Sequence, residues 1–229
     1  MKLTWFGHSA FRVEVGSSVI LIDPFLSGNS SFEGDVMVAA KGATHIALTH
    51  GHFDHVGDSI EIAEKTGASV IAVFELAGHL GEKADITTEP MATGGSLYFD
   101  DFNISMVRAD HSSSLEGVYT GCPAGFIIRA KKEEKTLYHM GDTDIFSDMA
   151  LINELYKPDI GIVPIGDRFT MSPCSAALAC TRYFDFETII PCHFGTWPLL
   201  TGTPEDFAQG LGNAKDKLSV MSVGDTLVL

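Results

Sequence analysis

The sequence of 229 residues predicts an α/β protein in which two β-sheets pack together with helices outside them. Two observations support this fold class: short β-like runs open each half of the chain, and strand–helix units follow them. No low-complexity linker and no short-period repeat separates the halves. We therefore expect one domain over residues 1–229.

The first half alternates or clusters apolar residues between turn-forming Gly and Ser, which is typical of strands. We expect strands at 3–6, 11–15, 19–22, 46–49, 69–74, 97–109 and 124–130. Helical spacing predicts one helix over 59–65, which stops at Gly67, and a second helix through Leu76 and Leu80.

The second half repeats a strand–helix rhythm. Strands are expected at 136–140, 160–165 and 188–191, and a β pair is expected to close the chain at Leu229. Helices are expected at about 147–156, from Ser172–Pro173 to Phe184, and at about 204–215. Ser172 is predicted to cap its helix, and Pro173 suits the first helical turn. The polar residues of interest then fall where strands end, and loops at one edge of a scaffold are where sites are built.

Charge and composition exclude several classes of protein. The 30 acidic residues outnumber the 15 basic ones, giving a net charge of -15, and such a surface repels nucleic-acid phosphates. No apolar run is long enough to span a membrane, and the first residues do not resemble a signal peptide. The four cysteines form no metal-binding or disulfide pattern, which fits a reducing cytoplasm. We expect a small-molecule substrate. The sequence is compatible with a monomer and with a homo-oligomer.

The most informative segment is His50-Gly51-His52-Phe53-Asp54-His55. Imidazole and carboxylate groups are ligands of zinc, manganese and iron(II). In an extended segment the side chains of residues i and i+2 point to one side. His50 and His52 are therefore expected to hold one ion, while Asp54 and His55, past a bend, reach toward a second.

Three further candidate ligands follow strands. His111 follows a β run, Asp142 stands in Gly141-Asp142-Thr143 just after a strand, and His193 ends the strand that passes through Cys192. A lone histidine is more often structural than a ligand. Three such residues at matched positions, beside the segment 50–55, instead predict a site for two metal ions.

With these residues the sequence resembles the metallo-β-lactamase superfamily, whose signature is the string from His50 to His55. The resemblance covers essentially the whole chain, and the three further ligands occur in the expected order and spacing. Residues 5–11, 21–25, 141–143 and 191–196 are similar to one branch, the metal-dependent hydrolases related to ascorbate-6-phosphate lactonase.

The resemblance implies an αββα sandwich, two mixed sheets flanked by helices, with a dinuclear metal site at the edge between the sheets. It also implies seven ligands, divided between the ions as follows: His50, His52 and His111 on the first ion, Asp54, His55 and His193 on the second, and Asp142 bridging both. Zinc or manganese is expected, with iron as the alternative, because all the ligands are nitrogen or oxygen atoms.

Two such ions can share a hydroxide at neutral pH and polarise the group that it attacks. Asp54 is then expected to be a ligand, to aim the hydroxide and to carry its proton. His8 lies in a motif of the lactonase-like branch and is a candidate catalytic residue for substrate binding or proton donation. Asp23 is a candidate hydrogen-bond acceptor for a liganding imidazole. Arg168, before the helix cap at Ser172, is a candidate anion contact or a solvated loop residue.

The resulting prediction is a metal-dependent hydrolase that acts on a small ester, lactone or phosphorylated metabolite. A phosphodiesterase or nuclease with the same metal cage is the alternative, and the acidic charge opposes it. Glyoxalase-II-type enzymes would be expected to have an added helical domain, and the β-lactamases proper usually lack an aspartate at the position of Asp142. Redox di-iron relatives carry glutamate where His52 stands, and a non-catalytic binding protein is disfavoured because no expected ligand is missing.

Overall fold

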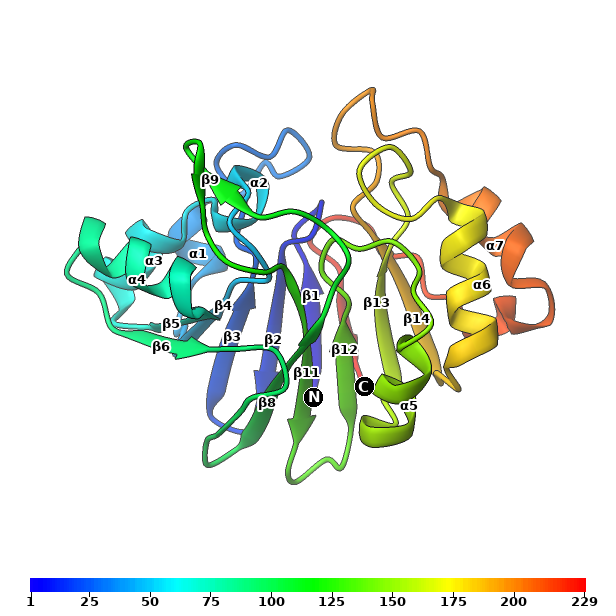
Figure 1. Ribbon diagram of the computed structural model, residues 1–229, viewed down its shortest axis with the longest axis horizontal. Helices are drawn as coiled ribbons and strands as arrows, with labels where there is room; N and C mark the ends of the chain where they lie inside the picture. The colour runs from blue at the N-terminus through cyan, green and yellow to red at the C-terminus, as the bar shows by residue number, and fades with distance from the viewer.

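Two large sheets face each other across the centre of the molecule in the computed structural model, which describes residues 1–229 (Figure 1). Helices cover the outer faces of both sheets, so the predicted four-layer arrangement is confirmed. The long loops gather along one edge of the two sheets, at the top of Figure 1.

The strands of the first sheet are β1 (Lys2–Trp5), β2 (Phe11–Val15), β3 (Ser18–Ile22), β4 (His45–Ala47), β5 (Ser69–Val73), β6 (Thr88–Met91) and β15 (Thr226–Val228). The strands of the second are β7 (Ser96–Tyr98), β8 (Phe102–Arg108), β11 (Ala124–Ala130), β12 (Thr136–His139), β13 (Ile160–Pro164) and β14 (Thr188–Cys192). A separate hairpin consists of β9 (Ser114–Leu115) and β10 (Val118–Tyr119). The helices are α1 (Val36–Ala39), α2 (Phe53–Val56), α3 (Ser59–Thr66), α4 (Phe74–Lys83), α5 (Met149–Tyr156), α6 (Pro173–Tyr183) and α7 (Pro204–Leu211), followed by the 3-10 helix η1 (Gly212–Lys217).

Both sheets mix parallel and antiparallel pairs. The first has the order β15-β1-β2-β3-β4-β5-β6 and becomes parallel from β3 onward. The second has the order β14-β13-β12-β11-β8-β7, with β12, β13 and β14 parallel. Helices α1, α3 and α4 lie outside the first sheet, and α5, α6 and α7 lie outside the second (Figure 1).

Strand β11 shows how the sequence places the core. Phe126 and Ile128 belong to the large apolar cluster that includes residues of both sheets, whereas Ile127 packs in a second cluster with Phe207 of α7. This follows from the two-residue period of a strand, which sends alternate side chains to opposite faces. Full burial of one such side chain contributes about 1.5–3 kcal/mol.

The helix starts agree with their local sequence. The Ser172 hydroxyl accepts a hydrogen bond from the Ser175 amide, and Pro173 occupies the first turn of α6. Thr203 caps α7 in the same way, with the Asp206 amide as donor. These caps satisfy amide groups that lack a partner inside the helix.

The structure differs from the sequence predictions at several elements. The predicted final β pair is wrong: the single strand β15 pairs with β1, at the other end of the chain. The predicted strand 97–109 is two strands, β7 and β8, joined in a hairpin. The helix expected to reach residue 215 ends at Leu211, because Gly212 takes a positive φ and the chain continues as η1. No helix has both the length and the apolar character needed to cross a membrane.

Candidate metal centre

All the predicted site residues lie at one edge of the two sheets. His8 stands in the turn between β1 and β2, Asp23 follows β3, and the segment 50–55 follows β4 and includes most of α2. The second sheet contributes the rest from its own strand ends: His111 after β8, Asp142 after β12 and His193 after β14. The site therefore spans the seam between the sheets, and each sheet supplies part of it.

The segment 50–55 bends at His52, which precedes the single turn of α2. The bend expected from sequence is this helical turn. The Gly51 amide donates to the Ser113 hydroxyl at 3.0 Å, and that hydroxyl lies 2.9 Å from Thr120 Oγ1. A Cβ at position 51 would collide with Thr120. The hairpin β9–β10, which lies between Ser113 and Thr120, is thus joined directly to this segment.

One cluster of donors consists of His50, His52 and His111, and its ligand atoms all lie within 4.8 Å of one another. Nε2 of His50 lies 2.9 Å from Nδ1 of His52. The ring centroid of His111 is 5.1 Å from the centroid of each of the other two rings. These are the three residues that the resemblance assigns to the first ion.

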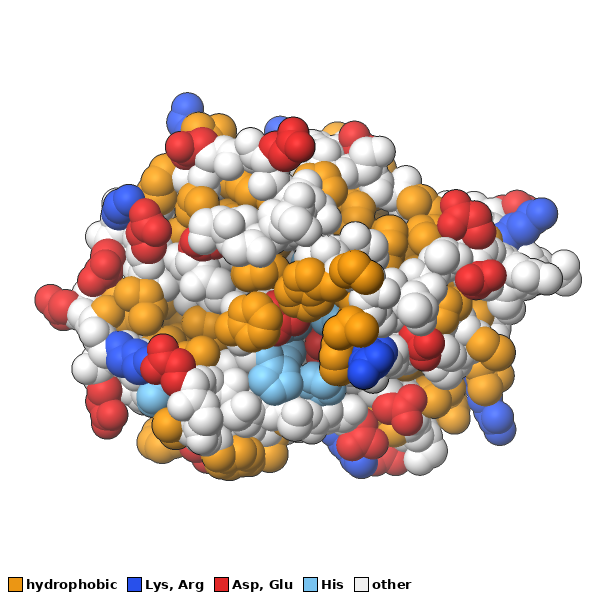
Figure 2. Space-filling view, turned by 90° about the horizontal axis from the view of Figure 1, so that it is seen from above, with side chains coloured by type: hydrophobic (Ala, Val, Ile, Leu, Met, Phe, Trp, Pro, Cys, Tyr) orange, Lys and Arg blue, Asp and Glu red, His pale blue; other side chains and the backbone are white.

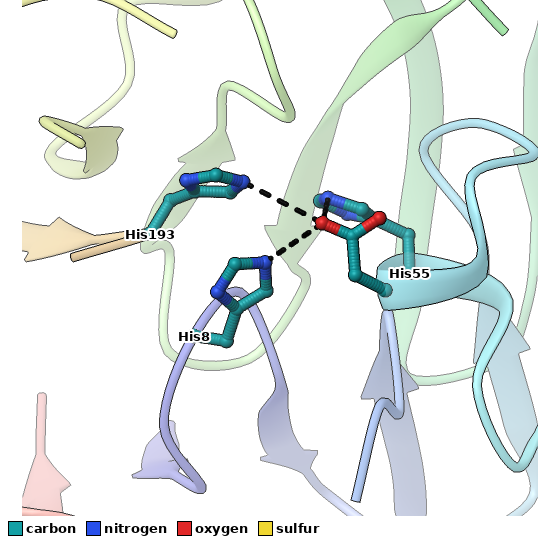
Figure 3. A group of neighbouring side chains, drawn as sticks. His8, His55 and His193 are labelled. Atoms are coloured by element: carbon teal, nitrogen blue, oxygen red, sulfur yellow. Dashed lines mark hydrogen bonds and ion pairs between the residues drawn. The ribbon is translucent and has the colours of Figure 1, made fainter. Parts of the chain in front are cut away.

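A second cluster consists of His8, Asp54, His55 and His193. Three imidazoles from separate parts of the chain point at one carboxylate oxygen (Figure 3). That oxygen is Oδ2 of Asp54, which lies 3.0 Å from His8 Nε2, 3.7 Å from His55 Nε2 and 3.8 Å from His193 Nε2. Three of these residues are the expected ligands of the second ion, and His8 stands directly beside them.

Asp142 lies between the two clusters. Its Oδ1 is 3.4 Å from His55 Nε2, and its Oδ2 is 3.1 Å from His193 Nε2 and 3.6 Å from His111 Nε2. A third group of potential ligands, His50, His55 and Asp142, links both clusters. One carboxylate therefore faces both sets of imidazoles, as a bridging ligand must.

Asp23 orients the cluster from behind and is fully buried. Its carboxylate accepts hydrogen bonds from the Thr49 amide at 2.8 Å and the Thr49 hydroxyl at 2.6 Å, and it lies 2.7 Å from His55 Nδ1. A proton held on Nδ1 by this carboxylate leaves Nε2 of His55 to face the donor cluster.

The backbone is constrained at three of these positions. His8, Asp23 and His193 have φ values of 52°, 45° and 55°, a region that residues with a Cβ seldom occupy. The His193 amide donates to the His8 carbonyl at 3.0 Å, and the Trp5 indole donates to the same oxygen. Strained backbone of this kind gathers at functional sites, where the surrounding structure holds it in place.

Burial and charge act differently on the two clusters. Burial lowers the pKa values of His50, His52 and His111, so these rings are neutral at pH 7 and keep a lone pair for a cation. Burial also disfavours charge on His55 and His193. The carboxylates of Asp142 and Asp54, joined by Asp23 at His55, together outweigh this effect of burial. The pKa of His55 is raised well above its ordinary value, and that of His193 is raised to about 9.

The donor set fits divalent cations. Nε2 of His55, Nε2 of His193 and Oδ1 of Asp142 are buried and lie within ion-pair distance of one another's residues, but none of them makes a hydrogen bond. Buried polar atoms without partners are costly, and coordination of a cation would satisfy all three. A cation would also displace the protons on the two raised imidazoles, because liganding histidines are neutral.

A pocket of about 420 Å³ opens above the donor atoms. It exposes His52, Asp54, His111, Asp142 and His193 and is otherwise lined by Phe53, Ser112, Phe169 and Trp197. Seen from above, pale blue histidines lie in a hollow beside hydrophobic side chains (Figure 2).

Sequence reasoning missed several residues of the site. Thr49 and Thr196 hold Asp23 and His8 by hydrogen bonds, and Trp197 lines the pocket. A threonine or tryptophan in a loop carries no spacing signal, so only the fold identifies these residues. Arg168 is exposed, and its guanidinium carbon lies 5.7 Å from the centroid of Phe169 at the pocket rim.

Comparison with known proteins agrees with this geometry. Residues 19–194 match the family described as the β-lactamase superfamily domain. A UPF0173 metal-dependent hydrolase of Methylocella silvestris is 52% identical over 232 residues, covering 100% of both chains. Another, from Mesorhizobium japonicum, is 50% identical over 236 residues with the same coverage.

A solved structure is also similar over nearly its whole length. Igni18, a metallo hydrolase from the hyperthermophilic archaeon Ignicoccus hospitalis, shares 34% identity and superimposes with a TM-score of 0.88. The alignment covers 99% of this chain and 97% of that one. The fold and the donor clusters thus define a hydrolase of the metallo-β-lactamase superfamily. Within that superfamily, the chain belongs to the UPF0173 metal-dependent hydrolases.

Proposed function

We propose that this enzyme uses two divalent cations to hydrolyse a small-molecule ester, lactone or phosphorylated metabolite. The observation that carries the proposal is the pair of donor clusters with Asp142 facing both. Three ligand atoms of these clusters are buried without hydrogen-bond partners, which is the state expected of a site built around cations.

The ligands divide as the two clusters do. His50, His52 and His111 would hold the first ion, and Asp54, His55 and His193 would hold the second, with Asp142 facing both clusters. Nitrogen and oxygen donors without thiolate suit zinc or manganese, and iron is the alternative. When bound, two such ions lower the pKa of a shared water and polarise the carbonyl group that the water attacks.

Asp54 is the residue that handles the proton. Its carboxylate accepts the proton that the water loses as the new C–O bond forms. It then returns this proton to the alcohol oxygen as the old C–O bond breaks. The carboxylate lies at the floor of the pocket, in contact with any substrate bound there.

His8 acts through Asp54 as a positioning residue. Burial and the neighbouring charge of His193 lower the pKa of His8 to about 4, so its ring is neutral at pH 7. Its two nitrogens lie 3.0 Å from Asp54 Oδ2 and 2.9 Å from Thr196 Oγ1, which fixes the ring between them. A neutral ring that donates from Nε2 keeps Asp54 ionised and aimed at the water.

The net charge of -15 favours small molecules over nucleic acids as substrates. A reducing cytoplasm suits the four free cysteines, two of which, Cys122 and Cys174, are exposed.

Reloading the metal-free protein tests the function. The protein is supplied with zinc or manganese and assayed on lactones, esters, thioesters and phosphodiesters, with His50→Ala as the blank. We expect turnover of a lactone or ester above the blank, and its loss in Asp54→Asn. Turnover of phosphodiesters alone, or equal rates in wild type and blank, would refute the proposal.

A further inference from the structure

The pocket above the donor clusters has an apolar wall on one side. Its volume of about 420 Å³ suits a small molecule. Phe53, Phe169 and Trp197 line it, and none of its lining residues is lysine or arginine. The polar groups of the pocket are Ser112 and the donor residues on its floor.

Part of this wall is a fixed aromatic cluster. The ring centroids of Phe25, Phe53 and Trp197 lie 5.9 to 6.1 Å apart. Phe25 is 5% exposed and packs against the other two rings. Trp197 also packs on His8, with centroids 4.9 Å apart. The wall is therefore held in place before any ligand binds.

Phe53 is 65% exposed although it stands between two proposed ligands, His52 and Asp54. Folding recovers little hydrophobic free energy from a ring left in water, so a core role does not explain it. An apolar ring at the mouth of a pocket gains that free energy when a ligand covers it. A group that covers Phe53 inside the pocket shares it with the donors, because Phe53 lines the pocket together with His52 and Asp54.

The charge of the residues along the wall indicates whether the group that covers Phe53 is charged or uncharged. A substrate with a phosphate away from its reacting bond needs a cation on the wall, and the lining residues supply none. Arg168 is exposed to solvent beside Phe169, where water and salt screen its charge.

We infer that the substrate is an uncharged ester or lactone bearing an apolar, aryl-sized group that packs on Phe53 and Trp197. The inference rests on the proposed function and narrows it, because it excludes phosphorylated metabolites. The apolar group lies against the aromatic wall, and the ester or lactone carbonyl reaches the donor clusters on the floor.

Paired substrates test this in the metal-loaded enzyme. The pairs are γ-phenyl- against γ-methyl-γ-butyrolactone and methyl phenylacetate against methyl propionate, with 6-phosphogluconolactone as the charged substrate. We expect the aryl member to have the higher kcat/KM, and Phe53→Ala to reduce that preference about tenfold. Phe74→Ala is the matched control, because Phe74 is 69% exposed and also begins a helix, away from the pocket. It should leave the preference unchanged.

A binding measurement separates this inference from the proposed function. The chain has two tryptophans, Trp5 and Trp197, and only Trp197 lines the pocket. Phenylacetamide should change the fluorescence of the metal-free protein, bind about tenfold more weakly to Phe53→Ala, and give no signal in Trp197→Phe. If no pair turns over above the His50→Ala blank, the proposed function fails and this titration alone decides the inference.

Two results would overturn the inference. One is a preference for 6-phosphogluconolactone that Arg168→Gln removes, because the phosphate would then be recognised at the rim. The other is an aryl preference, or phenylacetamide binding, that Phe53→Ala and Phe74→Ala affect equally.

Discussion

Replacing Asp23 with alanine removes the shared acceptor of a fully buried network. The Thr49 amide, the Thr49 hydroxyl and His55 Nδ1 all lose this acceptor, and the hydroxyl keeps only its contacts with Nδ1 of His50 and His55. Breaking a buried ion pair by removing one member costs about 3–5 kcal/mol. Three buried donors without this acceptor would each cost about 1–3 kcal/mol. The lower part of that total matches the range for a broken ion pair, because partial relaxation of the site reduces the cost.

The same change should weaken metal binding. His55 loses the carboxylate that holds the proton on Nδ1, so its Nε2 is no longer fixed toward the donor cluster. Losing such a partner of a liganding histidine lowers metal affinity about 10- to 100-fold. Urea unfolding of the metal-free protein measures the first effect, and zinc titration against a competing chelator measures the second.

Asp101 offers a matched control. It is 7% exposed and also accepts three hydrogen bonds, from the Ser17 amide, the Ser17 hydroxyl and the Ser18 hydroxyl. Asp101→Ala should therefore destabilise the protein and leave zinc affinity unchanged. The reasoning fails if Asp23→Ala binds zinc as wild type does, or if Asp101→Ala weakens binding equally.

Asp101 also makes stability depend on pH. The Ser17 side-chain and backbone hydrogen bonds lower the pKa of Asp101 to about 2, below the value of about 3.9 in an unfolded chain. The contribution of the ionised Asp101 carboxylate to stability is therefore complete above about pH 5 and is lost as pH falls toward 2. The difference in unfolding free energy between wild type and Asp101→Asn should shrink over that pH range. A difference that stays constant would contradict the lowered pKa of Asp101. Gly141→Ala should both destabilise the fold and weaken metal binding, because Gly141 has a φ of 66° and its Cβ would lie 2.5 Å from the Ala124 carbonyl oxygen. Unfolding and zinc titrations that match wild type would show that the turn before Asp142 tolerates a side chain.

The sequence was sufficient to predict most strands and to name all the residues of the two donor clusters, with His8 as a candidate catalytic residue rather than a ligand. Strand β4 is an apolar run that leads into His50, and β14 leads in the same way to His193, so each carries its signal locally. The resemblance to the superfamily then grouped ligands that lie far apart in the sequence, such as His50 with His111 and His55 with His193.

Other features depend on contacts between distant segments and could not be predicted. The hairpin β9–β10 has strands of two residues and is held by Ser113, Thr120 and Gly51 rather than by its own propensity. The pairing of β15 with β1 joins the two ends of the chain. The contact between His8 and Asp54 likewise requires the fold, because no periodicity links a turn after β1 to a helix after β4.

The division of the donors between two sheets has a consequence for how the protein folds and comes apart. Each proposed ion would be held by residues of both sheets: His111 would join two histidines of the first sheet, and His193 would join Asp54 and His55. Bound cations would thus act as cross-links that close long loops of the chain, much as disulfides do in proteins of oxidising compartments. Chelation would remove these cross-links at once, and the two sheets would then be held together by the apolar layer between them.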